Sequence, residues 1–508
     1  MSAILARARD YEIMAEREIT PDERPLFHLS PRTGWMNDPN GFGFYRGLYH
    51  LFYQYHPYDT EWGSMHWGHA VSRDLLTWRY LPAALAPDQE YDSFGCFSGS
   101  VEELPDGRQL ILYTSVSPDR TDPDGRMLQT QSIAVGDGTE YQKFSGNPVL
   151  TAEELPEGAT PYDFRDPHIW RTENRYAAVV ASDNRLRGTQ ILQIRSADGF
   201  RWEFDRILTE NRGRIGDMWE CPDYFPLDGR QILLASAMNM QEESLDFHRG
   251  NNTFCMIGRE GPDGTFEEDV LQTVDHGTDF YAAQTLKSPD GRRIMIGWMH
   301  NPGYALAVRG RTYTGQMTLP RELFLRDGRL CQRPIRELTR MRCGKTEHRG
   351  ILLGAEEHSA PGISGRALDL TITVRAVDSK EPYRRFRCRF AREGSRYVEL
   401  TYRPNEGILT LDRHAAGICE GALARRELSV RTEGGTFRVR MILDRFSAEL
   451  FLEDGGKTAS LTYSTPPSAG GITFSAEGDA RMDIEAYRLD PEKLDQNTEY
   501  GLEETWKK

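Results

Sequence analysis

The chain has 508 residues, which is too many for one ordinary hydrophobic core, so we expect at least two domains. Its 38% of hydrophobic and 10% of aromatic residues are typical of a folded protein. The formal net charge of -15 would be repelled by a nucleic-acid backbone or by anionic lipid, so we expect neither nucleic acid nor a membrane as a partner.

The beginning of the chain and its cysteines indicate where the protein works. Residues 1–24 contain no apolar run of signal-peptide length, and no stretch of the chain is apolar enough to span a bilayer. The seven cysteines are scattered and form no C-x-x-C pair. A disulfide framework or a structural zinc site is therefore not expected, and we predict a cytoplasmic protein.

A turn followed by an apolar strand recurs along the first 334 residues. Asp-Gly-Arg turns open the segments 106–112, 228–234 and 290–296, which begin 122 and 62 residues apart. Weaker copies lie at 45–52 and 172–180. These five copies predict a repeat of about 60 residues, which favours a five-bladed β-propeller over a β-sandwich with coincidental turns.

The pattern changes after Pro334. A short helix-like connector covers 335–341, and strands of alternating polarity follow, for example at 368–374 and 437–443. We therefore predict an all-β chain with a five-bladed β-propeller at 25–334 and a C-terminal β-sandwich at 351–490. An N-terminal extension (1–24), a linker (335–350) and a charged tail (491–508) complete the expected domains.

Three acidic residues precede three of the repeated turns by nearly the same distance. Asp38, Asp166 and Glu220 each lie seven or eight residues before a turn, on the strand expected to line the propeller axis. We expect them at equivalent positions that converge on one axial pocket. Trp35 and Trp219 lie near two of them and offer flat apolar faces to a sugar ring. Converging carboxylates with aromatic walls indicate glycoside hydrolysis.

Other interpretations of these residues fit the pattern less well. A single such Asp would most simply cap a turn. A calcium site would bunch its oxygen ligands at short spacing, which this sequence does not do, so no metal is expected. Cys221 could be a nucleophile, but no histidine is placed in the sequence to activate it, so a packing role is preferred.

Three motifs resemble the signatures of glycoside hydrolase family 32, which comprises invertases, sucrose-6-phosphate hydrolases and fructanases. They are Trp-Met-Asn-Asp-Pro-Asn-Gly at 35–41, Arg-Asp-Pro at 165–167 and Glu-Cys at 220–221. Further similar segments lie at 51–57, 97–100 and 446–455, so the resemblance covers nearly the whole chain.

The resemblance implies a retaining β-fructofuranosidase with a role for each motif residue. Asp38 would be the nucleophile, Glu220 the acid/base and Asp166 a stabiliser of the transition state. An ionised nucleophile is needed, so we expect a normal or lowered pKa for Asp38. The fructose subsite would be formed by further residues of these segments, namely Asn37, Gln54, Trp62, Phe97, Ser98 and Arg165.

The resemblance also bears on substrate and partners. It implies a small sugar as substrate, such as sucrose, sucrose-6-phosphate or a short fructo-oligosaccharide, and no cofactor. An exo-fructanase, a fructosyltransferase and a fructan-binding lectin without activity remain alternatives, because acceptor choice depends on loops that sequence alone does not define. A homo-oligomer formed through the β-sandwich is a further expectation.

Overall fold

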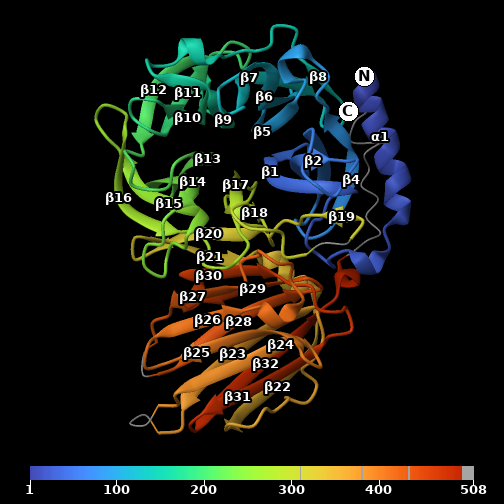
Figure 1. Cartoon of the computed structure of the whole chain (residues 1–508), viewed down its shortest axis with the longest axis vertical. Coiled ribbons are helices and arrows are strands. Elements are labelled where there is room, and N and C mark those ends of the chain that lie inside the picture. The colour runs from blue at the N-terminus through green and yellow to red at the C-terminus, as the bar shows by residue number, and fades with distance from the viewer. Residues whose placement is uncertain (309–310, 379–381, 433–434, 495–508) are drawn as a thin grey trace.

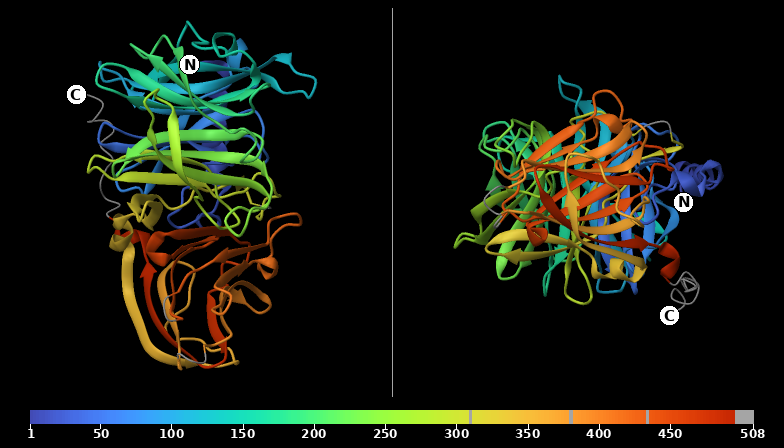
Figure 2. Two further views of the ribbon diagram at one scale, coloured as in Figure 1. Left: turned by 90° about the vertical axis from the view of Figure 1, so that its left-hand side faces the viewer. Right: turned by 90° about the horizontal axis from the view of Figure 1, so that it is seen from below.

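The repeated turns close five β-hairpins, and each hairpin begins one blade of a propeller (Figure 1). The computed structural model describes residues 1–308, 311–378, 382–432 and 435–494. A β-sandwich lies below the propeller, and Figure 2 shows the same stacking from a second side. The prediction of an all-β propeller followed by a sandwich is confirmed.

Each blade is an antiparallel sheet whose first strand lies nearest the propeller axis. The first blade contains β1 (Gly34–Tyr45), β2 (Leu48–His56), β3 (His66–Ser72) and β4 (Trp78–Leu85). The second contains β5 (Gly95–Glu103), β6 (Gln109–Thr121), β7 (Met127–Gly136) and β8 (Tyr141–Lys143). The third contains β9 (Ala159–Arg171), β10 (Tyr176–Asn184), β11 (Gln190–Ser196) and β12 (Glu203–Glu210).

The last two blades follow the same order and close the ring. The fourth contains β13 (Trp219–Leu227), β14 (Arg230–Met240), β15 (Gly250–Glu260) and β16 (Phe266–Thr273). The fifth contains β17 (Tyr281–Lys287), β18 (Arg293–Trp298), β20 (Arg321–Arg326) and β21 (Arg329–Pro334). Between β18 and β20, β19 (Tyr313–Thr314) pairs in parallel with β1, so the end of the ring is hydrogen-bonded to its beginning.

The sandwich packs two antiparallel sheets around its own apolar core. One sheet contains, in spatial order, β22 (Arg342–Leu353), β32 (Ala480–Leu489), β23 (Leu368–Ala376), β28 (Phe437–Asp444), β29 (Ser447–Leu452) and β30 (Lys457–Thr462). The other contains β27 (Arg425–Ser429), β26 (Ile408–Asp412), β25 (Arg396–Arg403), β24 (Arg385–Glu393) and β31 (Gly471–Glu477). Because β22 pairs with β32 from Arg342 onward, the later part of the predicted linker is a sandwich strand.

Helices are few and lie at the edges of the two sheet systems. Helix α1 (Ala3–Ala15) in the N-terminal extension lies along the first blade, where the Glu12 carboxylate accepts a hydrogen bond from the Ala83 backbone N–H at 3.1 Å. Short 3-10 helices occupy turns and connectors: η1 (Glu16–Glu18), η2 (Pro21–Glu23), η3 (Glu90–Asp92), η4 (Ala152–Glu154), η5 (Arg336–Met341), η6 (His414–Ala416), η7 (Glu453–Gly455) and η8 (Pro491–Lys493).

Two features of the chain ends and helices bear on earlier expectations. The helix-like connector expected at 335–341 is η5. Of the charged tail expected at 491–508, the structure describes only η8 and the buried Leu494, and residues 495–508 lie outside the described residues. Among the described helices, none is long and apolar enough to cross a membrane.

A buried histidine fastens the propeller to the sandwich. His28 Nδ1 lies 2.7 Å from an Asp444 carboxylate oxygen, and His28 Nε2 lies 2.8 Å from a Glu449 carboxylate oxygen. Burial alone would lower the pKa of His28, but the hydrogen bonds to the two carboxylates raise it to about 9. The imidazolium therefore stabilises the fold fully below its ordinary pKa of 6.5, and this contribution is lost as the pH rises through about 9.

We predict that His28→Gln removes this pH dependence. The rise from 6.5 to about 9 corresponds to roughly 3 kcal/mol, so the wild-type Tm should fall between pH 6.5 and 9.5 while that of the variant changes little. His66→Gln is the matched control and should keep the wild-type slope, because burial holds the pKa of His66 at about 4. A flat wild-type Tm over this range, measured by differential scanning fluorimetry, would contradict the charged state of His28.

Candidate active site

Every innermost strand of the propeller breaks its pairing with the second strand of its blade at the same level. In each case two residues face one on the partner strand, which is a β-bulge. The five pairs are Asn37 and Asp38, Phe97 and Ser98, Asp166 and Pro167, Cys221 and Pro222, and Ala282 and Ala283. A bulge redirects side chains, so five strands turn functional groups toward one end of the axis.

These side chains surround a cavity of about 350 Å³ at that end of the propeller. The cavity brings together all nine residues predicted for the site: Asp38, Asp166, Glu220, Asn37, Gln54, Trp62, Phe97, Ser98 and Arg165. Trp35 also lines it, as the sequence predicted. Four lining residues were not predicted, and all come from the fifth blade or from the segment after β18: Tyr281, Trp298, His300 and Pro302.

Two details of the sequence interpretation are wrong. The three acids do not occupy equivalent positions, because Asp38 is the second residue of its bulge, Asp166 is the first, and Glu220 is the paired residue before its bulge. Trp219 does not face the cavity. Neighbouring residues on a strand point to opposite sides, so while Glu220 faces the cavity, Trp219 packs fully buried inside the fourth blade against Phe254.

Two strong donors, Ser98 and Asn37, hold Asp38 at the cavity wall. Ser98 Oγ donates to Asp38 Oδ2 at 2.7 Å and Asn37 Nδ2 donates to Oδ1 at 3.1 Å. The Asn37 amide is itself fixed by the Trp35 indole N–H at 2.8 Å. Burial, and after it the charge of Glu220, raises the pKa of Asp38, so the expectation of a normal or lowered pKa is wrong. The hydrogen bonds from Ser98 and Asn37 oppose this shift.

Glu220 is oriented through both of its carboxylate oxygens. Arg165 donates to Oε1 at 3.2 Å through Nε, and Tyr281 donates its hydroxyl to Oε2 at 2.7 Å. Burial, followed by the charge of Glu220, raises the pKa of Tyr281 well above its ordinary value, so this phenol stays a donor. Arg165 is held in turn by Asp163 at 2.6 Å. The acid therefore has one defined orientation in the cavity.

Asp166 is fixed by hydrogen bonds to the two neighbouring blades. Its Oδ2 accepts the Cys221 backbone N–H at 3.0 Å, and its own N–H donates to Thr114 Oγ1 at 2.9 Å. Burial raises the pKa of Asp166 to about 7, with Arg165 opposing this shift and the Glu220 charge adding to it. This carboxyl thus loses its proton only near neutral pH in the empty site.

The Cys221 thiol separates two of the acids. Its Sγ lies 3.4 Å from Asp38 Oδ2 and 3.7 Å from Asp166 Oδ2. Burial, followed by the Asp38 charge, raises the pKa of this thiol well above its ordinary value, so it remains a protonated donor and is a poor nucleophile. Within the described residues, no three His, Cys, Asp or Glu side chains gather in a way that could hold a metal ion.

The cavity can therefore bind a small polar ring and act on it from two sides. Three carboxyl groups face it from three blades, and only Arg165 among its lining residues carries a compensating positive charge. Trp35, Trp62 and Phe97 supply apolar walls, and Trp62 remains 47% exposed at the rim. Carboxylates in such a site would stabilise a carbon atom of the bound ring that develops positive charge during a reaction.

Comparison with known proteins agrees with this geometry. The model of the glycosyl hydrolases family 32 N-terminal domain matches residues 28–334, and that of the family's C-terminal domain matches residues 337–488. The chain is 34% identical over 462 residues to a raffinose invertase of Escherichia coli, covering 90% of this chain and 93% of that protein.

Two further relatives match over nearly their full length. A sucrose-6-phosphate hydrolase of Zymomonas mobilis is 31% identical over 501 residues, with 94% of each chain covered. A solved β-fructofuranosidase of Bombyx mori superposes with a TM-score of 0.81 at 31% identity, covering 96% of this chain and 98% of that one. A variant of the Bombyx mori protein has been solved in complex with sucrose.

We predict that Asp166→Asn stabilises the protein at alkaline pH. A carboxyl whose pKa is raised from 3.8 to about 7 favours folding when protonated, and this contribution is lost as the pH rises from about 4 to 7. An amide stays neutral, so the free energy of unfolding at pH 8 should exceed that of wild type by on the order of 1–4 kcal/mol, with a difference that shrinks toward pH 4.

Asp444→Asn is the matched control for this prediction. Burial alone would raise the pKa of Asp444, but its hydrogen bond with His28 holds that pKa below the ordinary value, so this substitution should lower the Tm at pH 8. Thermal unfolding of both variants from pH 4 to pH 8 provides the measurement. A lower Tm for Asp166→Asn than for wild type at pH 8 would contradict the claim that the ionised Asp166 carboxylate destabilises the folded protein.

Proposed function

The chain belongs to glycosyl hydrolase family 32, and on that premise we propose that it is a retaining β-fructofuranosidase. Its substrate is sucrose, sucrose-6-phosphate or a short fructo-oligosaccharide, whose terminal fructosyl bond it hydrolyses. The observation that carries the proposal is the meeting of Asp38, Asp166 and Glu220 in one small cavity with aromatic walls.

In the first half of the reaction, Asp38 would attack the anomeric carbon of fructose while Glu220, in its acid form, protonates the leaving oxygen. Ser98 and Asn37 keep the attacking carboxylate fixed, so little reorganisation is needed. Asp166 lies beside Asp38, where its oxygens can accept hydrogen bonds from fructose hydroxyls and face the developing positive charge.

In the second half, water would attack the fructosyl-enzyme and Glu220 would accept its proton. Arg165 and Tyr281 serve this exchange as positioning residues, because each donates a hydrogen bond to one oxygen of the Glu220 carboxyl and so fixes its orientation. Because the pKa of Asp38 is raised, this nucleophile takes up a proton at a higher pH than a free aspartic acid does. As the pH is lowered, kcat/KM should therefore begin to fall at a pH above the ordinary pKa of Asp.

The size of the cavity supports a preference for short substrates. About 350 Å³ accommodates one fructosyl unit with part of its neighbour. The Gln284 side chain closes the axis beneath the cavity, with Nε2 donating to the Gly99 carbonyl at 2.8 Å and Oε1 accepting from the Phe42 N–H at 3.2 Å. A substrate must therefore enter and leave by the same mouth, as a chain end does.

Location and assembly are further parts of the proposal. All seven cysteines are free in the structure, which suits a reducing compartment, and a cytoplasmic location stays a prediction. Assembly of identical subunits through the β-sandwich also stays a prediction. Both can be tested on the native protein, the first by fractionation of cells and the second by light scattering in solution.

We predict that Asp38→Ala and Glu220→Ala each lower kcat for sucrose by at least ~10²-fold with an unchanged circular-dichroism spectrum. For Glu220→Ala, added azide should partly restore turnover of a fructoside with an activated leaving group, because protonation is then unnecessary and the anion can attack the fructosyl-enzyme. Asp106→Ala removes an exposed carboxylate in the β5–β6 turn and should leave kcat unchanged. Near-native activity of Glu220→Ala would move the acid/base role to another residue.

A second prediction concerns substrate length. Because the cavity is closed beneath the fructose subsite, kcat/KM for sucrose should exceed kcat/KM per chain end for long inulin or levan. Parallel assays with sucrose, sucrose-6-phosphate, inulin and levan give the ratio and identify the preferred substrate. A ratio favouring the polymers would contradict the preference for short substrates while leaving the hydrolytic mechanism in place.

A further inference from the structure

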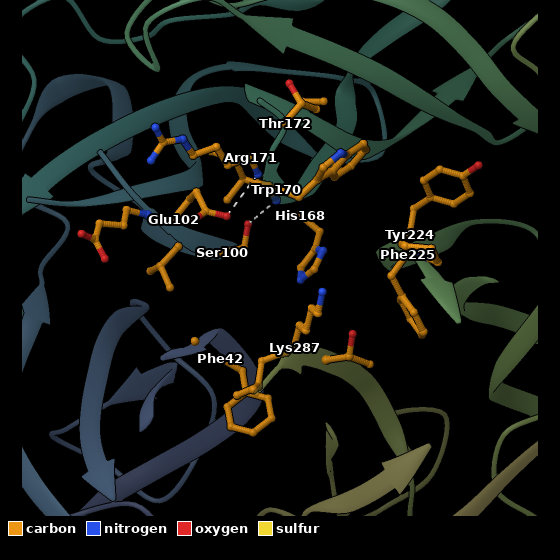
Figure 3. Close-up of a pocket in the computed structure, with 18 of the residues that line it drawn as sticks. Phe42, Ser100, Glu102, His168, Trp170, Arg171, Thr172, Tyr224, Phe225 and Lys287 are labelled. Carbon is orange, nitrogen blue, oxygen red and sulfur yellow. Dashed lines mark hydrogen bonds between the residues drawn. The ribbon is translucent and has the colours of Figure 1, made fainter. Parts of the chain in front are cut away.

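A second, larger cavity opens at the other end of the propeller axis (Figure 3). Its volume is about 650 Å³, and all five innermost strands contribute to it. Each of these strands also lines the active-site cavity, and on each strand the nearest such residue lies two to four positions earlier. On β9, for instance, Asp166 faces the active site, whereas His168 and Trp170 face the second cavity.

The two cavities are separate compartments. Gln284 lies between them and reaches from β17 to the carbonyl of Gly99 on β5, across the axis. One position further along β17, the Thr285 N–H donates to Asp223 Oδ2 at 2.7 Å, which ties the fifth blade to the fourth. A ligand in the second cavity therefore does not touch the catalytic carboxylates.

The two mouths carry opposite charge. The active-site cavity is lined by three carboxylates and one guanidinium. The second cavity is lined by six cationic side chains, Arg171, Arg175, Arg195, Arg206, Lys287 and Arg293, and by four carboxylates, Glu102, Glu103, Asp205 and Glu260. A chain with a net charge of -15 thus has a cationic funnel at one pole, and such a funnel attracts anions.

Some cations of this funnel form ion pairs with carboxylates and others do not. Arg195 and Arg206 pair with Asp205 and Glu260. By contrast, Arg171, Arg175 and Lys287 form no ion pair with a carboxylate anywhere in the described ranges of the chain. Lys287 is exposed, and Figure 3 shows its side chain pointing into the middle of the cavity toward His168.

The wall beside these cations is aromatic and has unused hydrogen-bonding groups. The rings of Trp170 and Tyr224 lie 6.0 Å apart and tilted, which forms a surface suited to the face of a sugar ring. Three buried polar atoms of this wall have no hydrogen-bond partner: Tyr224 Oη, Gln231 Oε1 and Arg206 Nε. These atoms are also shielded from solvent, so a ligand would reach them only if their side chains turned toward the cavity.

We propose that this cavity is a second binding site, which takes a phosphorylated sugar of monosaccharide to disaccharide size. Lys287 and the neighbouring arginines would hold the phosphate, and Trp170 and Tyr224 would lie against the ring. The proposal does not depend on the proposed activity, since the second cavity and the active-site cavity share no lining residue in the part of the chain that the structure describes.

The test is isothermal titration calorimetry of the full chain with fructose 6-phosphate, inorganic phosphate and fructose. We expect fructose 6-phosphate to bind at least ~10-fold more tightly than fructose, with an affinity that falls as salt rises. Lys287→Gln should weaken the binding of fructose 6-phosphate and of phosphate on the order of 10-fold, with kcat and KM for sucrose unchanged. Lys287 is exposed, so its removal should leave folding intact.

Two controls separate this site from the active site. Lys345→Gln removes an exposed lysine of the sandwich strand β22 and should leave phosphate binding unchanged. Asp38→Asn should retain the Lys287-dependent binding. The proposal is overturned if no binding of fructose 6-phosphate is detected at a concentration of about 10 mM, which would place Kd above the millimolar range. It is equally overturned if that sugar inhibits sucrose hydrolysis competitively and its binding is insensitive to Lys287→Gln.

Discussion

Five strands converge on the propeller axis, and a regular ladder would point alternate side chains of each strand into the neighbouring blades. The bulge that each strand makes at one level breaks this alternation, and in β9, β13 and β17 it places a non-glycine residue at positive φ: Asp166, Cys221 and Ala282. The backbone N–H groups redirected there donate to side chains of the preceding blade, as Cys221 does to Asp166. The same bulges therefore cause both the strained backbone conformations and the convergence of the side chains that form the site.

The same geometry explains the charge distribution of the site. Carboxyl groups from three blades cannot all be ionised in a small buried cavity without cost, and the raised pKa values of Asp38 and Asp166 express this repulsion and burial. Arg165 lies where it contacts Glu220 at 3.1 Å and Asp166 at 3.9 Å, so one buried guanidinium offsets two of the charges. Catalytic sites characteristically hold such destabilising groups, and the surrounding fold stabilises them.

Much of this arrangement could be predicted from the sequence, because turn chemistry and strand periodicity are local. Three Asp-Gly-Arg turns and two weaker copies of the repeat predicted five blades, and the distance from turn to acid predicted the convergence of Asp38, Asp166 and Glu220. Position within a bulge depends on pairing with the next strand, so the equivalence of the three acids was misjudged and Trp219 was assigned to the wrong face. Trp298 and His300 were missed because they lie at the end of β18, a second strand, although Gln54 occupies the corresponding end of β2.

The described residues of the sandwich line no part of the active-site cavity, but they anchor a segment that positions one of the residues that do. Asp275 and Asp279 lie in the segment that leads from β16 into β17, and the sandwich binds both: the Ser460 N–H donates to Asp275 at 2.8 Å and the Thr462 N–H to Asp279 at 2.7 Å. Arg413 pairs with Asp279 in a fully buried contact. Tyr281, whose hydroxyl donates to Glu220, follows Asp279 by two residues. Without the sandwich Asp279 would lose Arg413 and the Thr462 N–H, and Asp275 would keep Arg321 of the propeller but lose Ser460. The segment that sets the position of Tyr281 would then have fewer anchors. The second domain thus helps to fix the orientation of Glu220.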